Sequence, residues 1–206
     1  MTPQKLTIVT VAVAVVAVAA LLIVPRLGSQ AAEVDFSEHP RFGSPDAPVT
    51  IAVFEDFRCP ACAQFDATVL PTVKREYVDT GQASLVFVHF PVLGAASDHV
   101  ARIGECVFQQ SNDAFWDMKS PLYRAQGELD GARRAEELAL TYAPGVDEDT
   151  FRTCLASEES LERVRADRAI ALELNLRGTP SVVVNGSPLA SATMGDLRRA
   201  VEAALP

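Results

Sequence analysis

The sequence has few basic residues and few histidines, and these scarcities argue against two classes of protein. It carries 18 lysines and arginines against 27 aspartates and glutamates, a formal net charge of −9 at pH 7. Proteins that bind nucleic acid concentrate positive charge, so this acidity argues against a nucleic-acid partner. The histidines, His39, His89 and His99, have neither metal-ligand spacing nor a catalytic-triad order. We therefore expect them on the surface or in the core, and we expect no metal.

Acidic residues are absent before Glu33, where the chain instead contains an uncharged apolar run, Leu6–Val24. At about 1.5 Å per residue, this run can cross a hydrocarbon core about 30 Å thick. The basic residues Lys5 and Arg26 flank it, which weakly favours a cytoplasmic N-terminus and an exported body. Residues 1–25 are predicted to be a transmembrane signal anchor, with a cleaved signal peptide as the alternative. No cysteine lies nearby, which excludes a lipoprotein anchor.

The rest of the chain predicts one α/β domain. Residues 26–48 are rich in proline and glycine and are predicted to be a tether. Two β-rich runs, Val49–Phe54 and Ala83–Phe90, flank a helical stretch and indicate a β-α-β unit. Residues from about 95 to 176 are mostly helical in pattern. Ser181–Val184 then leads into an Asn-Gly hairpin turn, and a last helix closes the chain.

A Cys-Pro-Ala-Cys motif stands where the first predicted strand becomes the first predicted helix. Cys59 would occupy the helix N-terminus, where unpaired N–H groups and about half a positive charge stabilise a thiolate. Pro60 suits the first helical position because its missing N–H would be unpaired there anyway. Cys62 can close a disulfide ring with Cys59. We predict that the pair exchanges disulfides: a substrate thiolate attacks the Cys59 sulfur, and a second substrate thiol or Cys62 resolves the mixed disulfide.

Two other interpretations of the motif are open at this point. A zinc site would need Cys106 and Cys154 as further ligands, but the second close pair typical of structural zinc sites is missing. A purely structural disulfide between Cys59 and Cys62 would constrain little of the unfolded chain, because the ring is so short. Both are less favoured than redox exchange.

Three features in this order resemble the DsbA-like thiol:disulfide oxidoreductases: the Cys-Pro-x-Cys motif, the helical block, and Thr179-Pro180 before a strand and an Asn-Gly turn. The resemblance covers about residues 36–206. It implies a thioredoxin fold over residues 49–206 with an inserted all-helical subdomain at about 95–176. It also implies a cis proline at Pro180, beside the active disulfide, and a Thr179 backbone that pairs with a bound substrate strand.

The substrate-binding residues are then Pro60, Ala61, Thr179 and Pro180. Some strongly oxidising relatives have a histidine at the position of Ala61 that helps to stabilise the thiolate, which alanine cannot do. Glu55 and Asp56 would oppose a thiolate, whereas Arg58 would favour it. We therefore predict an oxidant of moderate strength.

Two aspartates near the motif have alternative interpretations. Asp56 and Asp66 are candidates for relaying protons to Cys62, but solvated charges at the helix ends are the favoured interpretation.

The other two cysteines also fall near apolar faces. Cys106 follows Ile103, and Cys154 follows Phe151, at helical spacing. Some DsbA-like proteins of Gram-positive and actinobacterial type have a second, structural disulfide, and the resemblance implies one between Cys106 and Cys154. The alternative is two buried free thiols. In the chain-entropy model, a bridge that closes a loop of this length contributes roughly 4 kcal/mol.

We interpret the chain as a membrane-tethered, extracytoplasmic disulfide oxidoreductase that introduces disulfides into exported cysteine-containing proteins and needs no dissociable cofactor. As an oxidase it would need a membrane partner to reoxidise it, and the resemblance points to DsbB-like or vitamin K epoxide reductase-like proteins. The alternatives are a disulfide reductase or isomerase of the same fold, and a binding module whose redox pair is idle.

Overall fold

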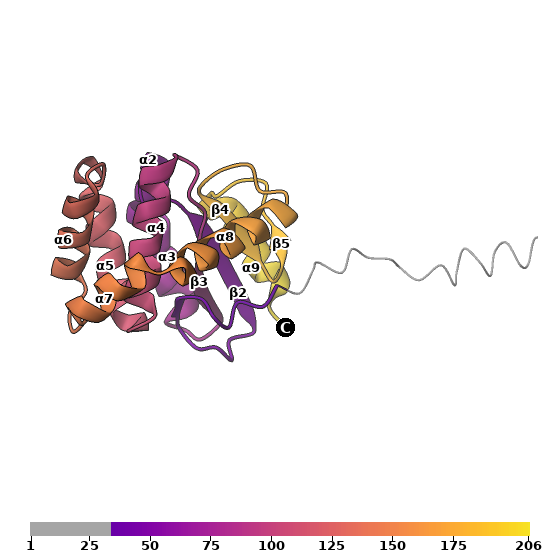
Figure 1. Ribbon diagram of the computed structural model, residues 1–206. Coiled ribbons are helices and arrows are strands. Elements are labelled where there is room, and N and C mark those ends of the chain that lie inside the picture. The colour runs from indigo at the N-terminus through magenta and orange to yellow at the C-terminus, as the bar shows by residue number, and fades with distance from the viewer. Residues whose placement is uncertain (1–33) are drawn as a thin grey trace, which may run out of the picture. The chain divides into compact units, whose positions relative to one another are not determined.

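The structure is a computed structural model that describes residues 34–206 (Figure 1). The predicted anchor, residues 1–25, and the beginning of the predicted tether lie outside the described residues. Within residues 34–206, no helix combines the length and the apolar character that a membrane span requires.

A five-stranded mixed sheet, in the order β1-β3-β2-β4-β5, forms the centre of this unit. The strands are β1 (Arg41–Phe42), β2 (Val49–Glu55), β3 (Ala83–His89), β4 (Ser181–Val184) and β5 (Ser187–Pro188). β2 and β3 pair in parallel, and every other neighbouring pair is antiparallel. The parallel pair, joined through a helical connection, is the predicted β-α-β unit, and β4 with β5 is the predicted hairpin.

The central strand β2 is buried on both faces. Ile51 and Val53 belong to one apolar core, whereas Ala52 and Phe54 belong to a second core on the opposite face. Successive side chains of a strand point to opposite faces, so a strand covered on both sides is apolar at nearly every position. This explains why β2 has a continuous apolar run instead of an alternating pattern.

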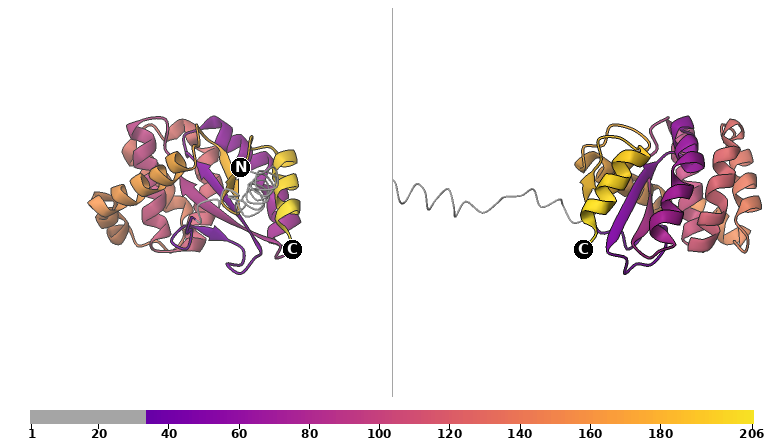
Figure 2. Two further views of the ribbon diagram at one scale, coloured as in Figure 1. Left: turned by 90° about the vertical axis from the view of Figure 1, so that its right-hand side faces the viewer. Right: turned by 180° about the vertical axis from the view of Figure 1, so that it is seen from behind.

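Helices cover both faces of the sheet. Four helical segments pack on the first core: α2 (Pro60–Thr68), α3 (Leu70–Val73), the following π-helical turn (Lys74–Val78) and α9 (Met194–Ala204). Helix α8 (Glu158–Glu173) packs on the second core through Ala171. Figure 2 shows α9 lying against the strands.

A helical subdomain separates β3 from β4 in the chain. Besides α8 it contains α4 (Ala95–Phe108), α5 (Asn112–Arg124), the 3-10 turn Gln126–Glu128, α6 (Ala132–Tyr142) and α7 (Glu148–Ala156). In Figure 1, α5, α6 and α7 lie to one side of the sheet, whereas α8 crosses in front of the strands. This is the arrangement that the resemblance to DsbA-like proteins implies: a sheet that carries the motif, and an inserted helical block beside it.

The structure differs from the predicted tether, residues 26–48, in its second half. Phe36 is buried in the second core, and Arg41 and Phe42 form β1, which pairs with β3. The His39 Nε2 donates to the Asp167 carboxylate of α8 at 2.9 Å, 128 residues away in the chain. Proline and glycine density marks irregular backbone, but irregular backbone can still pack. The contacts that order this segment come from residues far along the chain.

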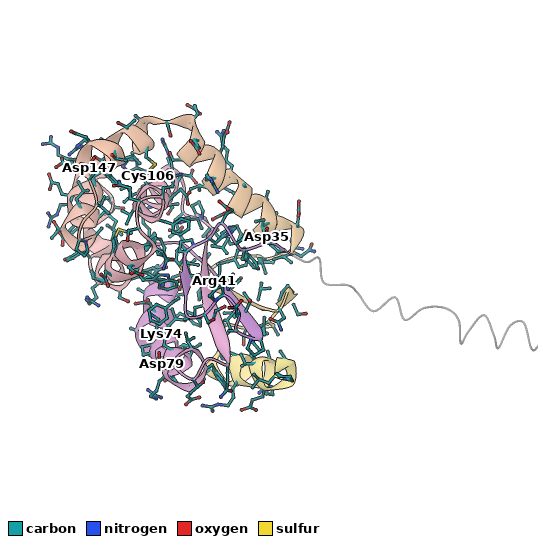
Figure 3. All side chains as sticks on the ribbon, turned by 90° about the horizontal axis from the view of Figure 1, so that it is seen from below. Asp35, Arg41, Lys74, Asp79, Cys106 and Asp147 are labelled. Atoms are coloured by element: carbon teal, nitrogen blue, oxygen red, sulfur yellow. A yellow bond between two sulfur atoms is a disulfide. The ribbon has the colours of Figure 1, made fainter. Side chains whose placement is uncertain are left out.

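Within the helical subdomain, a disulfide joins Cys106 of α4 to Cys154 of α7. The two sulfur atoms are 2.02 Å apart, and the Cα atoms are 5.7 Å apart. Cys106, labelled in Figure 3, lies among the helices of this subdomain and is fully buried. The alternative of two free thiols at these positions is therefore wrong in this structure.

We expect the double variant Cys106→Ala/Cys154→Ala to lose about 4 kcal/mol of unfolding free energy, because the bridge limits the unfolded chain. Urea unfolding, with the Cys59 and Cys62 pair in the same redox state in both proteins, measures the loss. Thiol counting in denaturant is an independent check on the wild type. After reduction of only the accessible pair, two free thiols are expected, and four would contradict the bridge.

Candidate active site

The structure places the Cys-Pro-Ala-Cys motif at the start of α2. Cys59 is the N-cap, with extended backbone, and Pro60 is the first helical residue. The Cys59 carbonyl accepts from the backbone N–H of Cys62 at 3.0 Å and of Ala63 at 3.2 Å, which begins the helix. Pro60 and Ala61 are exposed at the helix terminus. A sulfur atom at this position lies beside the positive end of the helix dipole.

Thr179 and Pro180 lie against the motif, although they are about 120 residues away in the chain. The peptide bond between them is cis, and the Cys59 Sγ donates to the Thr179 carbonyl at 3.4 Å. The loop that holds them runs directly into β4, which pairs with β2. Because the motif follows β2, the pairing of these two strands brings the loop and the motif together.

The two cysteines of the motif have different surroundings, and both are free thiols in this structure. Cys59 keeps 8% of its surface exposed, whereas Cys62 keeps none. Burial raises the pKa of the Cys62 thiol far above its ordinary value, and the nearby carboxylate of Glu55 raises it further. Cys59 therefore meets an attacking group more readily, while Cys62 favours its protonated form.

A buried group of three charges lies beneath the motif, and it is formed by Glu55, Asp66 and Lys119. The Lys119 Nζ is 2.8 Å from Glu55 Oε2 and 2.8 Å from Asp66 Oδ1. Glu55 ends β2, Asp66 belongs to α2, and Lys119 comes from α5 of the helical subdomain. Glu55 and Lys119 are each 1% exposed, so the pairing takes place out of contact with water.

Protonation of this group is set by two opposing effects. Burial raises the pKa of Glu55, and the neighbouring ammonium of Lys119 lowers it, with a net rise. For Lys119, burial lowers the pKa, but Glu55 and Asp66 raise it, with a net rise. One ammonium thus faces two carboxyl groups. Glu55 is the carboxyl group of this set whose pKa is raised, and its charge influences the Cys62 thiol.

Sequence reasoning did not identify Lys119 as part of the site. One signal was present: Lys119 lies on the apolar stripe of its helix, four residues after Phe115 and three before Leu122, which are both fully buried. A lysine on the apolar face of an amphipathic helix needs a buried partner of opposite charge. The identity of that partner depended on tertiary packing.

The favoured interpretation of Asp56 and Asp66 as solvated helix-end charges is wrong, because Asp56 is buried and the Asp66 side chain is largely covered. Asp56 is 2% exposed, and Asp66 pairs with Lys119. The Asp56 carboxylate accepts from the backbone N–H of Arg58 at 2.8 Å and, through its other oxygen, of Val92 at 2.9 Å and Leu93 at 3.2 Å. It therefore ties the active-site turn to the loop after β3.

A pocket of about 430 Å³ lies beside Asp66, between α2 and α5. Its lining consists of Ala63, Asp66, Ala67, Pro71, Ser120, Tyr123 and Arg124. Asp66 is thus the member of the three-charge group that borders a solvent-accessible space.

The remaining candidate residues have structural surroundings. Burial lowers the pKa of His89 to about 4, so this core histidine is neutral. Residues 34–206 contain no cluster of three or more side chains able to hold a metal ion. The zinc alternative for the motif fails, because Cys106 and Cys154 are joined to each other and cannot serve as its ligands.

Comparison with known proteins places this geometry among disulfide-exchange proteins. Residues 36–203 match the family model described as Thioredoxin. The chain is 39% identical over 171 residues to the probable disulfide bond formation protein D of Bacillus anthracis, covering 81% of this chain and 78% of that one. It is 37% identical to its Bacillus cereus counterpart, covering 81% and 79%. The fold is similar to that of oxidised BdbD from Bacillus subtilis, with a TM-score of 0.74 at 24% identity, over 84% of this chain and 95% of that one.

Replacing Lys119 with methionine is expected to lower the unfolding free energy by about 3–5 kcal/mol at pH 7, because it leaves buried carboxyl groups without their partner. In the variant, the pKa of Glu55 would lie further above that of the unfolded chain, because the ammonium that lowers it is gone. Such a group favours the folded state at low pH, and that contribution is lost as the pH rises. The deficit should therefore be smaller at pH 5 than at pH 7, as measured by urea unfolding.

The matched control is Arg152→Met. Arg152 pairs with Glu148 on the surface of α7, where a pair contributes little. A Lys119→Met protein that is as stable as this control at pH 7 would contradict the energetic importance of the three-charge group.

Proposed function

Because the chain belongs to the DsbA-like thiol:disulfide oxidoreductases of the thioredoxin family, we propose that Cys59 and Cys62 are the pair through which it acts. The protein is a disulfide oxidoreductase that forms disulfides in exported proteins. The observation that carries the assignment is the asymmetry of the pair: Cys59 at the terminus of α2 and beside Thr179, and Cys62 buried behind it. Cys59 is the sulfur that clients attack.

In the oxidised protein, a client thiolate attacks the Cys59 sulfur of the Cys59–Cys62 disulfide. The disulfide breaks, a mixed disulfide forms between the client and Cys59, and Cys62 leaves with the electron pair and takes up a proton. A second client thiolate then attacks the client sulfur of the mixed disulfide, and Cys59 leaves as a thiolate. The client loses two electrons, which the cysteine pair gains.

The surroundings of each sulfur suit these two roles. A leaving thiolate departs faster when its pKa is low, and the N-terminus of α2 stabilises the Cys59 thiolate in that step. Burial favours the protonated form of Cys62, so its departure requires a proton. We assign Glu55 as the proton donor, because it is the buried acid with a raised pKa next to Cys62. Asp66 borders the pocket and can return the proton from solvent.

The exposed residues Pro60 and Ala61 and the cis loop Thr179-Pro180 form the proposed client-binding surface. The loop lies within hydrogen-bonding distance of Cys59. An extended client segment that pairs with the Thr179 backbone would have its cysteine beside the Cys59 sulfur. Backbone pairing does not depend on the client's side chains, which suits an enzyme that acts on many proteins.

We also propose that residues 1–25 are a single-pass membrane anchor and that the catalytic body lies on the extracytoplasmic side. The support is the apolar run Leu6–Val24 and the Cys106–Cys154 bridge, which would persist in an oxidising compartment. Each cycle leaves the pair reduced, so an oxidant must restore it. A DsbB-like or vitamin K epoxide reductase-like membrane protein is the proposed partner.

In a Cys62→Ser variant, the Cys59 thiolate attacks a client disulfide, forms a mixed disulfide with one client sulfur and releases the other as a thiolate. The adduct should persist, because the Cys62 thiol that would displace the client is gone. Non-reducing electrophoresis of the protein isolated from exporting cells should show client adducts that disappear on reduction. The matched variant Cys59→Ser should trap few or none. Equal trapping by both variants would contradict the assignment of Cys59, and no trapping by either would favour an idle redox pair.

The reduction potential of the Cys59 and Cys62 pair tests the direction of exchange. We expect a value of about −120 to −180 mV, the range between DsbA and protein disulfide isomerase, from titration against glutathione. Because alanine stands at position 61, where some strongly oxidising relatives have a histidine, we expect the potential to lie toward the less oxidising end, about −180 mV. A value near the thioredoxin value of about −270 mV would contradict an oxidase and favour a reductase.

A further inference from the structure

A glutamine of the helical subdomain, Gln126, donates hydrogen bonds to the backbone of the active-site turn, residues 57–59. The Gln126 Nε2 atom lies 2.8 Å from the Phe57 carbonyl and 2.8 Å from the Cys59 carbonyl. Gln126 begins the 3-10 turn between α5 and α6, 67 residues after Cys59. One side-chain amide therefore donates to both carbonyls that bracket Arg58 in the active-site turn.

The two carbonyls depend on this donor to different degrees. The Cys59 carbonyl also accepts from two N–H groups of α2. The Phe57 carbonyl belongs to a residue that is 2% exposed, and among residues 34–206 no other hydrogen bond reaches it. A buried carbonyl without a donor is costly. Gln126 therefore stabilises the conformation in which both oxygens point toward the helical subdomain.

A second contact joins the same two segments. The Arg58 guanidinium pairs with Asp130, four residues after Gln126, and also donates to the Leu93 carbonyl at 3.3 Å. Backbone and side chain of the turn 57–59 are thus both attached to the segment 126–130. Pro60 contributes no N–H at the helix terminus, so the turn has one donor fewer of its own.

We propose that Gln126 is a positioning residue for the Cys59 thiolate. Two carbonyl oxygens that converge near a cysteine carry partial negative charge, which opposes a thiolate, and the Gln126 amide offsets that charge while it fixes the turn. The sulfur is thereby kept at the terminus of α2, where the N–H groups favour the ionised form. The inference rests on the proposed function, in which Cys59 is the reactive sulfur.

The test compares Gln126→Met and Gln126→Asn with the wild type. Methionine has a similar length and no donor, and asparagine has the donors on a shorter side chain that no longer reaches both carbonyls. The readout is the rate of iodoacetamide alkylation of Cys59 in the reduced, full-length protein as a function of pH. Both variants should shift the midpoint of the profile upward. At a pH below both midpoints, they should react roughly fivefold more slowly, the factor expected for one lost hydrogen bond.

The exchange equilibrium with glutathione should move by a similar factor toward the disulfide, because the reduced form has lost thiolate stabilisation. The matched control is Gln110→Met. Gln110 also bonds two backbone groups, the N–H and the carbonyl of Asp147, but it does so away from the motif. This control should keep the wild-type pH profile.

The outcomes separate the inference from the function on which it rests. If wild-type Cys59 reacts at low pH and both Gln126 variants have the wild-type profile, the role of Gln126 is overturned while the proposed function stands. If the wild-type protein shows no reactive thiol at Cys59, the proposed function itself fails. A variant that shifts only thermal stability, with an unchanged profile, would show a purely structural role and would also overturn the inference.

Discussion

The buried contact of Lys119 with Glu55 and Asp66 is the interaction on which the site depends. It joins three elements, β2, α2 and α5, through the buried Lys119 and Glu55 and the largely covered Asp66. Separated, these charges would each be costly to bury, so the elements that carry them must pack together. The same contact shapes the environment of Cys62, since Glu55 is both the partner of Lys119 and an acid whose charge raises the pKa of that thiol.

The helical subdomain is therefore part of the active site. Lys119 reaches the buried acids from α5, and Gln126 reaches the active-site carbonyls from the turn that follows α5. The Cys106–Cys154 bridge closes α4 onto α7 within the same subdomain. A thioredoxin-like sheet alone would provide the motif and the cis loop. In this protein, the inserted helices supply the counter-charge and the backbone donor that surround them.

The N-terminal segment of the domain was predicted to be a tether but packs onto the fold, and this difference has a general physical cause. The segment around Phe36 and His39 has the composition of a linker, yet it packs against the sheet and against α8. Its order comes from partners such as Asp167, which composition does not reveal. The same holds for Asp56: its position before the motif suggested a solvated charge, but three backbone N–H groups from two segments enclose it.

Local pattern was sufficient to predict the β-α-β unit, the Asn185-Gly186 hairpin and the position of Cys59 at a helix N-terminus, because each depends on residues within a few positions of one another. The resemblance to DsbA-like proteins added the cis loop and the second disulfide. Lys119 and Gln126 became visible only in the tertiary structure. Each acts on groups more than fifty residues away, and such contacts follow from how the helical subdomain packs beside the sheet. The sequence thus determined the chemistry of the motif, and the packing decided which charges and donors surround it.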